Sequence, residues 1–599
     1  MVCSMAGCGE SNTESNASSS KATSALKDGT YSATKRGHNG PVTLDVTVTD
    51  GKIADVAVVE SHETKGIGDL AMNRVIDAAV ENNSASIDTC TGATISSATT
   101  VQCLKDALKQ AGADDDMFKG DKINVNNVLS EDSYDYDVVV IGAGGAGLTA
   151  AVSAVENGAS VVVLEKTSQC GGNTLVSGGE FNIPCTDVQL KLAEEADDDK
   201  KALYEGDSVD LYAEDTLKGG DNLANPELVH TLAENALPSY EWLKDDVNLE
   251  IVPDELMHFG AHSKSRAIKT VSHSGYEMIH KLETAALDKG VAIEFNTKAV
   301  ELMKNDEGEI TGVKAENNGK EVTFNAKDGI VLGSGGFGAN VEMRKKYNPD
   351  IDEKYKTTCI RAAQGDGIVM AEAVGADLVD MEQIQVYPIC NVNTGIISFV
   401  ADSRFDGALI VDQNGERIVN EMGRRDEISN AILGTEEKAA YVVWGQEIEN
   451  ASHMTERCAD EFATLKEDGL LVEADTLEEA AAAMGINAKE LEKTIDAWND
   501  HVENGTEVEP VKRGAQVVIK EGPFYIEKAA PATHHTMGGV VINPEAEVIS
   551  VDGEVIPHFF AAGEVTGGIH GTNRLGGNAI TDCVVFGRIA GNNVVEDAE

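Results

Sequence analysis

The chain has 599 residues, more than one compact core usually holds, so several domains are expected. Its 102 acidic residues against 48 lysines and arginines give a formal net charge of −54. Such a field repels phosphate backbones and argues against nucleic acid as a partner. Hydrophobic residues make up 42% of the chain, as in ordinary globular proteins, and no run of 18 apolar residues could cross a membrane as a helix.

The first 28 residues differ in composition from the rest of the chain. Met5-Ala6-Gly7-Cys8 resembles the end of a bacterial lipoprotein signal, and residues 9–28 are rich in Ser, Asn and Thr, as flexible tethers are. The resemblance implies a lipid on Cys8 and an extracytoplasmic location, with the membrane contacted only through this anchor. An ordinary N-terminal tail is the alternative. The ten cysteines form no CxxC pair, so neither covalent haem nor a zinc ribbon is expected, and we predict no metal site.

Residues 29–112 carry the pattern of a small α+β domain. Residues 43–48 and 53–58 alternate between apolar and polar side chains around Asp50-Gly51, which indicates a hairpin. Helical stretches follow, the last ending near residue 112. Residues 113–133 are acidic and rich in Asn, without a sustained period, and we interpret them as a linker.

A buried strand at residues 137–141 leads into a glycine-rich turn, a helix at 148–157 and a second strand that ends on Glu165. Glycines permit the tight turn and the approach of a pyrophosphate to the helix N-terminus, and an acid 18 residues past Gly147 is placed to bind a ribose hydroxyl. A chance glycine-rich turn is the alternative. The predicted cofactor contacts here are Gly142, Gly144, Gly145, Ala146, Gly147, Glu165 and Lys166.

Two later segments suggest which dinucleotide is bound. Residues 330–338, after hairpin turns at 305–308 and 317–319, and residues 559–564 resemble the return strand and the strand over the ribityl chain of FAD-binding two-dinucleotide-fold flavoproteins. Both must join one sheet. The predicted fold is therefore an α/β, Rossmann-like FAD-binding domain made of residues 134–381 and 534–599. An inserted α+β capping domain, residues 382–533, splits it, and the small domain at 29–112 precedes it.

Six motifs resemble the soluble fumarate reductase and flavocytochrome c family: Gly171–Thr174, Ser177–Gly179, Asn420-Glu421, Arg425-Asp426, His534–Gly539 and His570–Asn578. The resemblance implies reduction of an α,β-unsaturated carboxylate with non-covalent FAD. It also implies FAD contacts from Gly172, Asn173, Thr174, Gly178, Gly179, Gly336, Glu564, Asn578, Ala579 and Ile580.

The same resemblance suggests roles for five side chains. Arg574 and His534 hold one substrate carboxylate, Arg425 delivers a proton, and Arg404 with Asp402 is the candidate relay that reprotonates it. These residue types suit the reaction, because a guanidinium and an imidazole stabilise the negative charge that develops beside the carboxylate. Structural ion pairs are the alternative for each residue taken alone.

Residues 88–96, Asp-Thr-Cys-Thr-Gly-Ala-Thr-Ile-Ser, resemble the flavinylation sequence of FMN-binding domains. The match implies that a flavin transferase attaches FMN covalently, by a phosphodiester, at Thr94. A Ser/Thr-rich helix cap is the alternative. FMN beside an FAD domain would carry electrons inward from an extracytoplasmic or membrane-associated donor.

Substrate preference is suggested by departures from the fumarate pattern. Gln385-Val-Tyr387-Pro388 stands where the family has Gln-x-His-Pro, and Tyr387 with Asp402 resembles the branch that reduces urocanate to imidazole propionate. Glu180 is a further predicted acceptor for the ring, and Phe259 is predicted to stack on it, with core packing as its alternative. Fumarate and aryl acrylates such as cinnamates remain alternative substrates, and a non-catalytic electron carrier is a different class of function.

Overall fold

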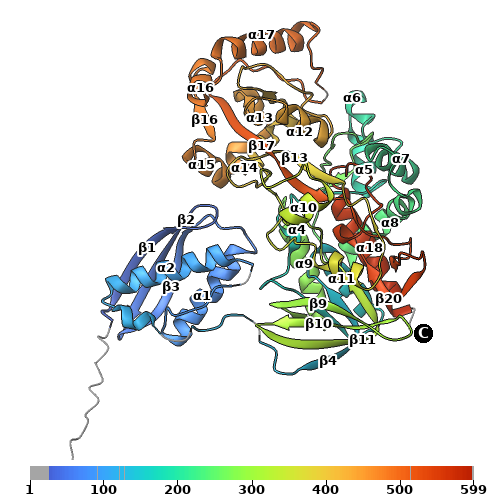
Figure 1. Ribbon diagram of the computed structural model, residues 1–599. Coiled ribbons are helices and arrows are strands. Elements are labelled where there is room, and N and C mark those ends of the chain that lie inside the picture. The colour runs from blue at the N-terminus through green and yellow to red at the C-terminus, as the bar shows by residue number, and fades with distance from the viewer. Residues whose placement is uncertain (1–25, 91, 120–121, 127, 513, 597–599) are drawn as a thin grey trace, which may run out of the picture.

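The computed structural model describes residues 26–90, 92–119, 122–126, 128–512 and 514–596. Three hydrophobic cores divide this part of the chain: one from Leu26 to Ala111, one from Leu129 to Val594, and one from Tyr387 to Ala532 that interrupts the second. Figure 1 shows the three bodies, with the N-terminal domain in blue and the inserted domain in yellow and orange. Cys8 lies outside the described residues. None of the helices in the described ranges is long and apolar enough to span a bilayer.

The N-terminal domain is a three-stranded antiparallel sheet with two helices packed on it. Its predicted hairpin is present, and both Asp50 and Gly51 have positive φ, as the tight turn requires. Alternate residues of the central strand are fully buried, so one face of the sheet forms the core. The elements are β1 (Gly29–Arg36), β2 (Pro41–Thr49), β3 (Lys52–Ser61), α1 (Gly68–Asn82), α2 (Thr94–Gln110) and the 3-10 helix η1 (Asp115–Phe118).

The FAD-binding domain is built on an eight-stranded sheet. Its central order is β19-β20-β11-β4-β5-β8, with β10 and β9 extending from β11 as an antiparallel meander. The first part contains β4 (Ser133–Ile141), α3 (Gly145–Glu156), β5 (Val161–Leu164), α4 (Gly172–Leu175), β6 (Phe181–Asn182), α5 (Asp187–Glu195), α6 (Asp198–Lys201), α7 (Val209–Gly219), α8 (Pro226–Asp245), β7 (Ala267–Ile268), α9 (Gly275–Asp288), β8 (Ala292–Glu294), β9 (Thr297–Lys304), β10 (Ile310–Asn317), β11 (Lys320–Leu332), α10 (Val341–Tyr347), α11 (Asp366–Ala373) and β12 (Leu378–Val379). The C-terminal part begins with β18 (Gly539–Val540), which pairs with β12 in a separate two-stranded sheet. It returns to the eight-stranded sheet through β19 (Glu547–Ile549) and β20 (Val555–Ala561), and the 3-10 helix η3 (Gly563–Val565) and α18 (Asn578–Glu596) follow.

Pairing of β11 with β20 confirms that the two distant segments share one sheet. Ile330 lies opposite Phe559, and Leu332 opposite Ala561, in parallel register. On the sheet, α18 packs closely against α3, because Gly587 and Gly591 have no room for a Cβ beside the α3 backbone. The C-terminal helix therefore lies against the helix that begins at the glycine-rich turn.

The inserted domain has its own sheet, in the order β13-β17-β15-β14 with β16 also paired to β17. Its elements are β13 (Ile384–Asn391), the 3-10 helix η2 (Val400–Asp406), β14 (Leu409–Val411), α12 (Arg425–Leu433), β15 (Ala440–Trp444), α13 (Gln446–Ser452), α14 (Met454–Arg457), α15 (Ala459–Glu467), β16 (Leu471–Ala474), α16 (Leu477–Met484), α17 (Ala488–Asn504) and β17 (Phe524–Thr536). Strand β17 continues from this domain toward the FAD-binding domain, so the predicted boundary between residues 533 and 534 falls inside one strand.

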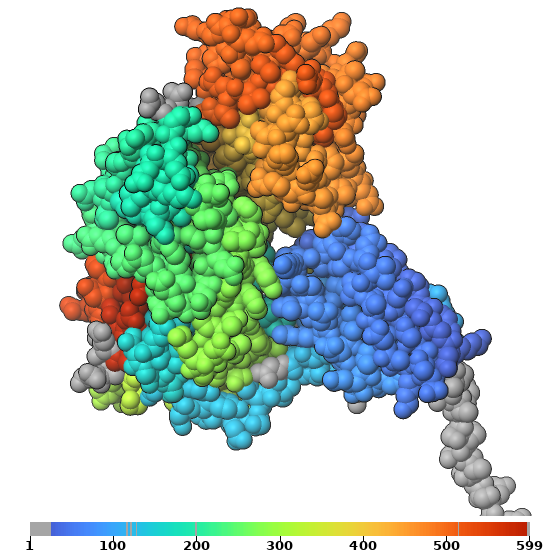
Figure 2. Space-filling view, turned by 180° about the vertical axis from the view of Figure 1, so that it is seen from behind, coloured from blue at the N-terminus to red at the C-terminus, as the bar shows by residue number. Residues whose placement is uncertain are grey.

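The N-terminal domain contacts both other bodies (Figure 2). On the FAD-binding domain, Lys65 lies over the ring of Tyr276 at 4.8 Å, and Gly66 packs against the same ring without room for a Cβ. On the inserted domain, the guanidinium of Arg36 lies 3.1 Å from the carboxylate of Asp468.

Candidate active site

The predicted dinucleotide turn joins β4 to α3. A Cβ on Gly142 would lie 2.6 Å from the carbonyl oxygen of Gly333, and one on Gly147 would collide with the Gly142 carbonyl, so both glycines are required by packing. A Cβ on Gly144 would meet no atom closer than 3.8 Å. Gly144 is the N-cap of α3, so open space lies in front of amides that have no partner within the helix. This arrangement fits the pyrophosphate of FAD.

Glu165 and Lys166, which follow β5 directly, have different partners near this turn. The carboxylate of Glu165 accepts the backbone amides of Ala143 at 2.9 Å and Thr167 at 2.7 Å, and its remaining lone pairs stay available to ribose hydroxyls. The ammonium of Lys166 instead forms an ion pair with Asp366 at 2.5 Å. The predicted cofactor contact of Lys166 stays a prediction beside this salt bridge.

A second group of predicted FAD contacts meets around Glu564. Its carboxylate accepts the side-chain amide of Asn173 at 2.9 Å and the backbone amide of Thr536 at 3.1 Å, and burial raises its pKa. Gly336 has no room for a Cβ beside Glu564. The remaining members of the group lie on α4 or just after it: Gly172, Thr174, Gly178 and Gly179, of which Gly172 and Gly179 have positive φ.

The first turn of α18 holds the last predicted FAD contacts. The side-chain oxygen of Asn578 accepts hydrogen bonds from Tyr212 at 2.9 Å and Asn182 at 2.8 Å, and its amide donates to Thr216 at 3.1 Å. These three hydrogen bonds orient the Asn578 side chain within the protein, and its predicted contact with the cofactor stays a prediction. The backbone amides of Ala579 and Ile580 belong to the first turn, where a helix has no acceptor of its own.

A cavity of about 30 Å³ lies between the inserted domain and the FAD-binding domain. This volume holds about one water molecule, which is too little for a substrate in this arrangement of the two domains. Both the first predicted carboxylate anchor and the predicted proton donor line it. The lining residues are Phe259, Gly260, Tyr387, Arg404, Phe405, Met422, Gly423, Arg424, Arg425, Asn573, Arg574, Leu575 and Gly576.

Arg425 is the first residue of α12. Its Nη1 donates to Oε1 of Gln385 at 3.0 Å, its guanidinium lies 4.8 Å from the ring centre of Tyr387, and burial lowers its pKa. The amide of Gln385 also donates to the carbonyl of Arg574 at 2.7 Å. The side chain of Gln385 thus forms hydrogen bonds with both arginines. It was not predicted as a site residue, although it begins the Gln-x-Tyr-Pro segment that drew attention to Tyr387.

Arg574 and His534 lie on the other side of this arrangement. Burial lowers the pKa of Arg574 well below its usual value, and its Nε has no hydrogen-bond partner in the described residues. Nδ1 of His534 lies 2.7 Å from the hydroxyl of Thr358, and burial with the charges of Arg425 and Arg574 holds its pKa well below the usual range. A neutral imidazole that accepts from Thr358 carries its proton on Nε2, where it can donate to a carboxylate. His534 is not among the residues that line the cavity. Its ring centre lies 5.0 Å from the ring centre of Tyr387, which does line it.

The predicted ring-binding residues divide into two groups. Phe259 and Tyr387 line the cavity, and Phe259 meets Phe405 edge to face at 6.5 Å. Asp402 and Glu180 are absent from the lining. Asp402 lies behind Arg404, with Oδ1 at 4.0 Å from Nε, and the Nη2 of Arg404 lies 3.4 Å from the hydroxyl of Tyr387.

Partial burial raises the pKa of both carboxyl groups, so they bind a proton more readily than free carboxyl groups do. It raises the pKa of Asp402 to about 7 and also raises that of Glu180, and the charge of Glu180 contributes to the value for Asp402. Arg425 and Arg457 oppose both increases. The two carboxyl groups therefore act on each other and on the proton donor.

Thr94 is the first residue of α2 and is exposed. The helix N-cap is Ala93, without a side-chain cap hydrogen bond, so the helix-cap alternative for the threonine is not supported. Gly92, just before it, approaches Thr167 of the FAD-binding domain so closely that a Cβ would lie 2.8 Å from that side chain. Thr91, in the same motif, lies outside the described residues.

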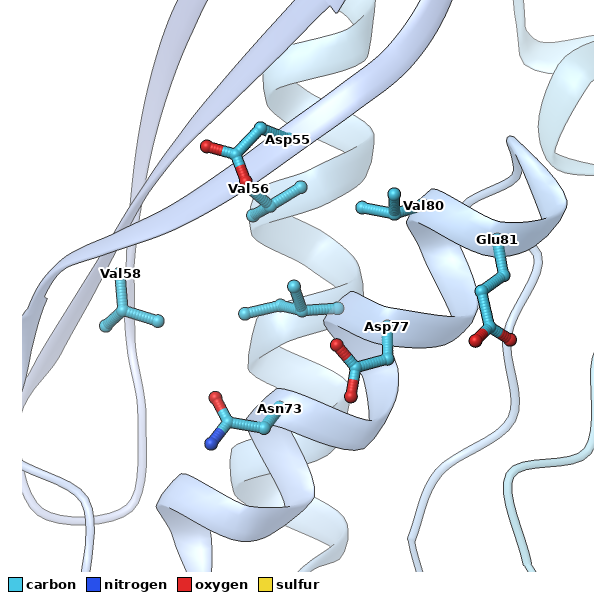
Figure 3. Close-up of a pocket in the computed structure, with 8 residues that line it drawn as sticks. Asp55, Val56, Val58, Asn73, Asp77, Val80 and Glu81 are labelled. Carbon is cyan, nitrogen blue, oxygen red and sulfur yellow. The ribbon is translucent and has the colours of Figure 1, made fainter.

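A larger hollow of about 410 Å³ lies on the N-terminal domain, between β3 and α1 (Figure 3). Its lining includes Val56, Val58 and Val80 and three acidic residues, Asp55, Asp77 and Glu81. Three carboxylates repel a phosphate, so this hollow does not suit the phosphate of FMN.

Comparison with known proteins agrees with the fold and with the motifs. The family described as FAD binding domain matches residues 137–580, and the FMN-binding domain matches residues 37–109. The urocanate reductase of Eggerthella lenta is 38% identical over 567 residues, which cover 94% of this chain and 91% of that protein. A fumarate reductase (cytochrome) of Shewanella frigidimarina is 34% identical over 462 residues, 77% of each chain. The open conformation of a flavocytochrome c3 fumarate reductase superposes with a TM-score of 0.64 at 32% identity, covering 78% of both chains.

These matches identify the chain as an FAD-binding flavoprotein with an additional FMN-binding domain. Within that class, it belongs to the flavocytochrome c fumarate reductase family. The predicted fold class and family resemblance are confirmed, whereas the roles of individual site residues and the domain boundaries stay predictions.

Proposed function

We propose that the protein reduces the carbon–carbon double bond of an α,β-unsaturated carboxylate, and that its substrate is urocanate, which becomes imidazole propionate. One observation carries the reaction class. Arg425 and Arg574 line one cavity, and within the described residues neither forms an ion pair with a carboxylate. Two buried, unpaired guanidinium groups are costly unless a ligand supplies the missing negative charge.

The residues divide the work as follows. Arg574, assisted by neutral His534, holds the substrate carboxylate. FAD, when bound at the α3 turn, supplies the hydride. Arg425 gives a proton to the other alkene carbon, and its lowered pKa makes a guanidinium a better acid there than in water.

Three features support urocanate. The relative that is 38% identical over nearly the whole chain is a urocanate reductase. Phe259 and Tyr387 give the cavity an aromatic wall, which suits an imidazole ring. Asp402 lies 4.0 Å from Arg404, which lines the cavity beside Tyr387. When Asp402 is ionised, its negative charge partly offsets the positive charge of Arg404 where the imidazole ring would bind.

Two other substrates have an observation in their favour. Fumarate would find a third guanidinium in the lining, that of Arg404, for its second carboxylate. An aryl acrylate would suit an aromatic wall from which the Asp402 carboxyl is hidden. A non-catalytic electron carrier would need none of these groups in one cavity.

The substrate is tested by reducing the holoprotein with dithionite under anaerobic conditions and adding urocanate, fumarate or cinnamate. We expect urocanate to reoxidise the flavin with much the highest kcat/KM, and mass spectrometry to identify imidazole propionate. A kcat/KM for fumarate equal to that for urocanate would indicate a fumarate reductase instead. Activity on cinnamate alone would show that the aromatic residues of the cavity do not bind an imidazole ring. Flavin that stays reduced with all three acids would support the carrier function.

Electrons reach the FAD-binding domain, in this proposal, through FMN attached covalently by a flavin transferase at Thr94. The exposed position of Thr94 and the close approach of Gly92 to Thr167 support the attachment and a short path between the domains. We further propose an extracytoplasmic location with a lipid on Cys8 and an external electron donor. Peptide mass spectrometry of protein made with the transferase, and lipid labelling of the native chain against a Cys8→Ser variant, test the two modifications.

A further inference from the structure

The turn that carries Arg574 has buried partners that the proposed reaction does not use. Residues 573–576 form one part of the cavity lining. The carbonyl oxygen of Gly576 accepts hydrogen bonds from Nε2 of His262 at 3.2 Å and from the side-chain amide of Asn182. Both donors are buried, and neither is among the residues that line the cavity. The position of this turn is therefore fixed by groups outside the cavity.

Arg266 determines which nitrogen of His262 carries the proton. Its Nη1 lies 3.0 Å from Nδ1 of the imidazole, and because a guanidinium can only donate, Nδ1 must be the acceptor. The proton of the neutral ring is then on Nε2, the atom that faces Gly576. Burial and the charge of Arg266 lower the pKa of His262 to about 3, so the ring stays neutral near pH 7. The amide of Asn182 also lies 3.2 Å from Nε2, but it donates to Gly576 and Asn578, so both of its hydrogens are used elsewhere.

Two carboxylates hold Arg266 in this orientation. Its Nε and Nη2 donate to Asp207 at 3.0 and 2.7 Å, and its Nη1 donates to Asp215 on α7 at 2.7 Å. With the contact to His262, four of the five N–H groups of the guanidinium have acceptors. The side chain is fully buried, and its guanidinium carbon lies 5.1 Å from the ring centre of Tyr212. A lysine could not reproduce this arrangement, because an ammonium lacks the planar fork of donors. We name the four linked residues the Arg266 network: Asp207, Asp215, His262 and Arg266.

The segment that holds His262 also carries one residue of the aromatic wall. The backbone amide of His262 donates to the carbonyl of Phe259 at 3.3 Å. Ser263 joins this segment to the network, since its amide and hydroxyl donate to Asp215 at 2.9 and 2.7 Å. A Cβ on Gly576 would lie 2.7 Å from Cγ of Phe259. The turn of Arg574 and the aromatic wall are therefore packed against each other and held by the same buried groups.

We propose that His262 and Arg266 are positioning residues that fix the distance between Arg574 and the ring of Phe259, and that this distance sets the length of the enoate that binds. The inference rests on the proposed function, in which Arg574 binds the carboxylate and Phe259 faces the ring of urocanate. Two alkene carbons separate the carboxylate from the ring in urocanate, so one spacing of the two anchors suits it. Neither His262 nor Arg266 contacts the substrate in this proposal.

The first test measures binding and needs no turnover. Imidazole propionate reaches both anchors, whereas propionate reaches only Arg574. Each is titrated into the oxidised holoprotein, and Kd is obtained from the change in flavin absorbance. His262→Leu removes the Nε2 donor and should weaken imidazole propionate about tenfold, as the loss of one buried hydrogen bond predicts, with a much smaller change for propionate. An equal loss for both ligands, or no loss for either, would overturn the proposal.

A rescue variant and a matched control separate positioning from general stabilisation of the fold. His262→Gln can still donate to Gly576 through its side-chain amide, so it should restore most of the affinity for imidazole propionate. His501→Leu is the control, because Nδ1 of His501, on α17, lies 2.5 Å from the carbonyl oxygen of Thr506, outside the cavity. It should leave both Kd values unchanged even if Tm falls. A Gln variant that binds as weakly as the Leu variant, with a wild-type Tm, would contradict the role of the Nε2 donor.

Steady-state kinetics provide the second test. His262→Leu should raise KM for urocanate about tenfold while kcat per bound flavin falls less. The ratio of kcat/KM for urocanate to that for acrylate, which has no ring to reach the wall, should fall with it. An unchanged ratio would show that the network does not affect selectivity.

Gly576→Ala tests the same distance if His262→Leu does not fold. Its Cβ would displace the ring of Phe259 from the turn, so affinity for imidazole propionate should again fall more than affinity for propionate. Equal effects on the two ligands would overturn the proposal. Failure of the wild type to reduce any enoate would refute the proposed function instead, and the two Kd values would still test the positioning.

Discussion

An ion pair beside Arg425 joins the inserted domain to the FAD-binding domain. Arg424, the N-cap of α12, binds the carboxylate of Asp221 through two hydrogen bonds of 2.7 and 3.0 Å. Asp221 belongs to the FAD-binding domain, where the hydroxyl of Thr572 also donates to it at 2.5 Å. The pair therefore fixes the start of α12, and with it Arg425, against the opposite side of the cavity. We predict that Asp221→Asn weakens closure.

The size of this effect follows from the Asp221 carboxyl. Arg424 and Thr572 lower its pKa from 3.8 to about 2, which corresponds in full to roughly 2.4 kcal/mol. Its side chain is 53% exposed, so solvent screening reduces the contribution to about 1 kcal/mol. Because the pKa of Asp221 is lowered, the ionised carboxylate stabilises the closed form above about pH 4. This stabilisation is lost as the pH falls toward 2, so all of it is present at neutral pH.

A loss of about 1 kcal/mol corresponds to roughly a fivefold change in an equilibrium constant. Asp221→Asn should therefore lower kcat/KM about fivefold through KM, with kcat little changed, because Arg425 is still present. Steady-state kinetics with urocanate at low and high salt measure this, and the difference should shrink at high salt. Asp426→Asn is the matched control, since Asp426 binds the same Arg424 at 2.9 Å without crossing between domains. Equal effects from both variants would show that the interdomain contact has no role of its own.

Three further predictions concern single side chains. Arg425→Lys should leave flavin content and dithionite reduction intact but slow reoxidation by substrate about 10²- to 10⁴-fold in stopped-flow experiments, and near-normal turnover would assign the proton to another residue. Arg574→Gln should raise KM on the order of a hundredfold, from the loss of about 2–3 kcal/mol of charged hydrogen bonding, and an unchanged KM would exclude it as the carboxylate anchor. Thr94→Val should lack the FMN mass in peptide spectra and lose turnover with an external donor while dithionite-driven turnover persists. FMN on that variant would place the attachment elsewhere.

Much of the fold was predictable because its signals are local. The Asp50-Gly51 hairpin and the turn from Gly142 to Gly147 each depend on a few adjacent residues with special backbone geometry. The boundary predicted near residue 533 has no comparable local signal. Strand β17 continues through it without a glycine, and its residues pair with β15 and β16 at one end and with β13 at the other.

Side-chain roles were predicted less completely, because they depend on partners far away in the sequence. Motif resemblance placed Arg425, Arg574 and Tyr387 on one cavity, as the structure has them. It could not indicate that Lys166 pairs with Asp366, 200 residues later. Nor could it indicate that the side chain of Gln385, in a different domain from Arg574, holds that arginine's backbone.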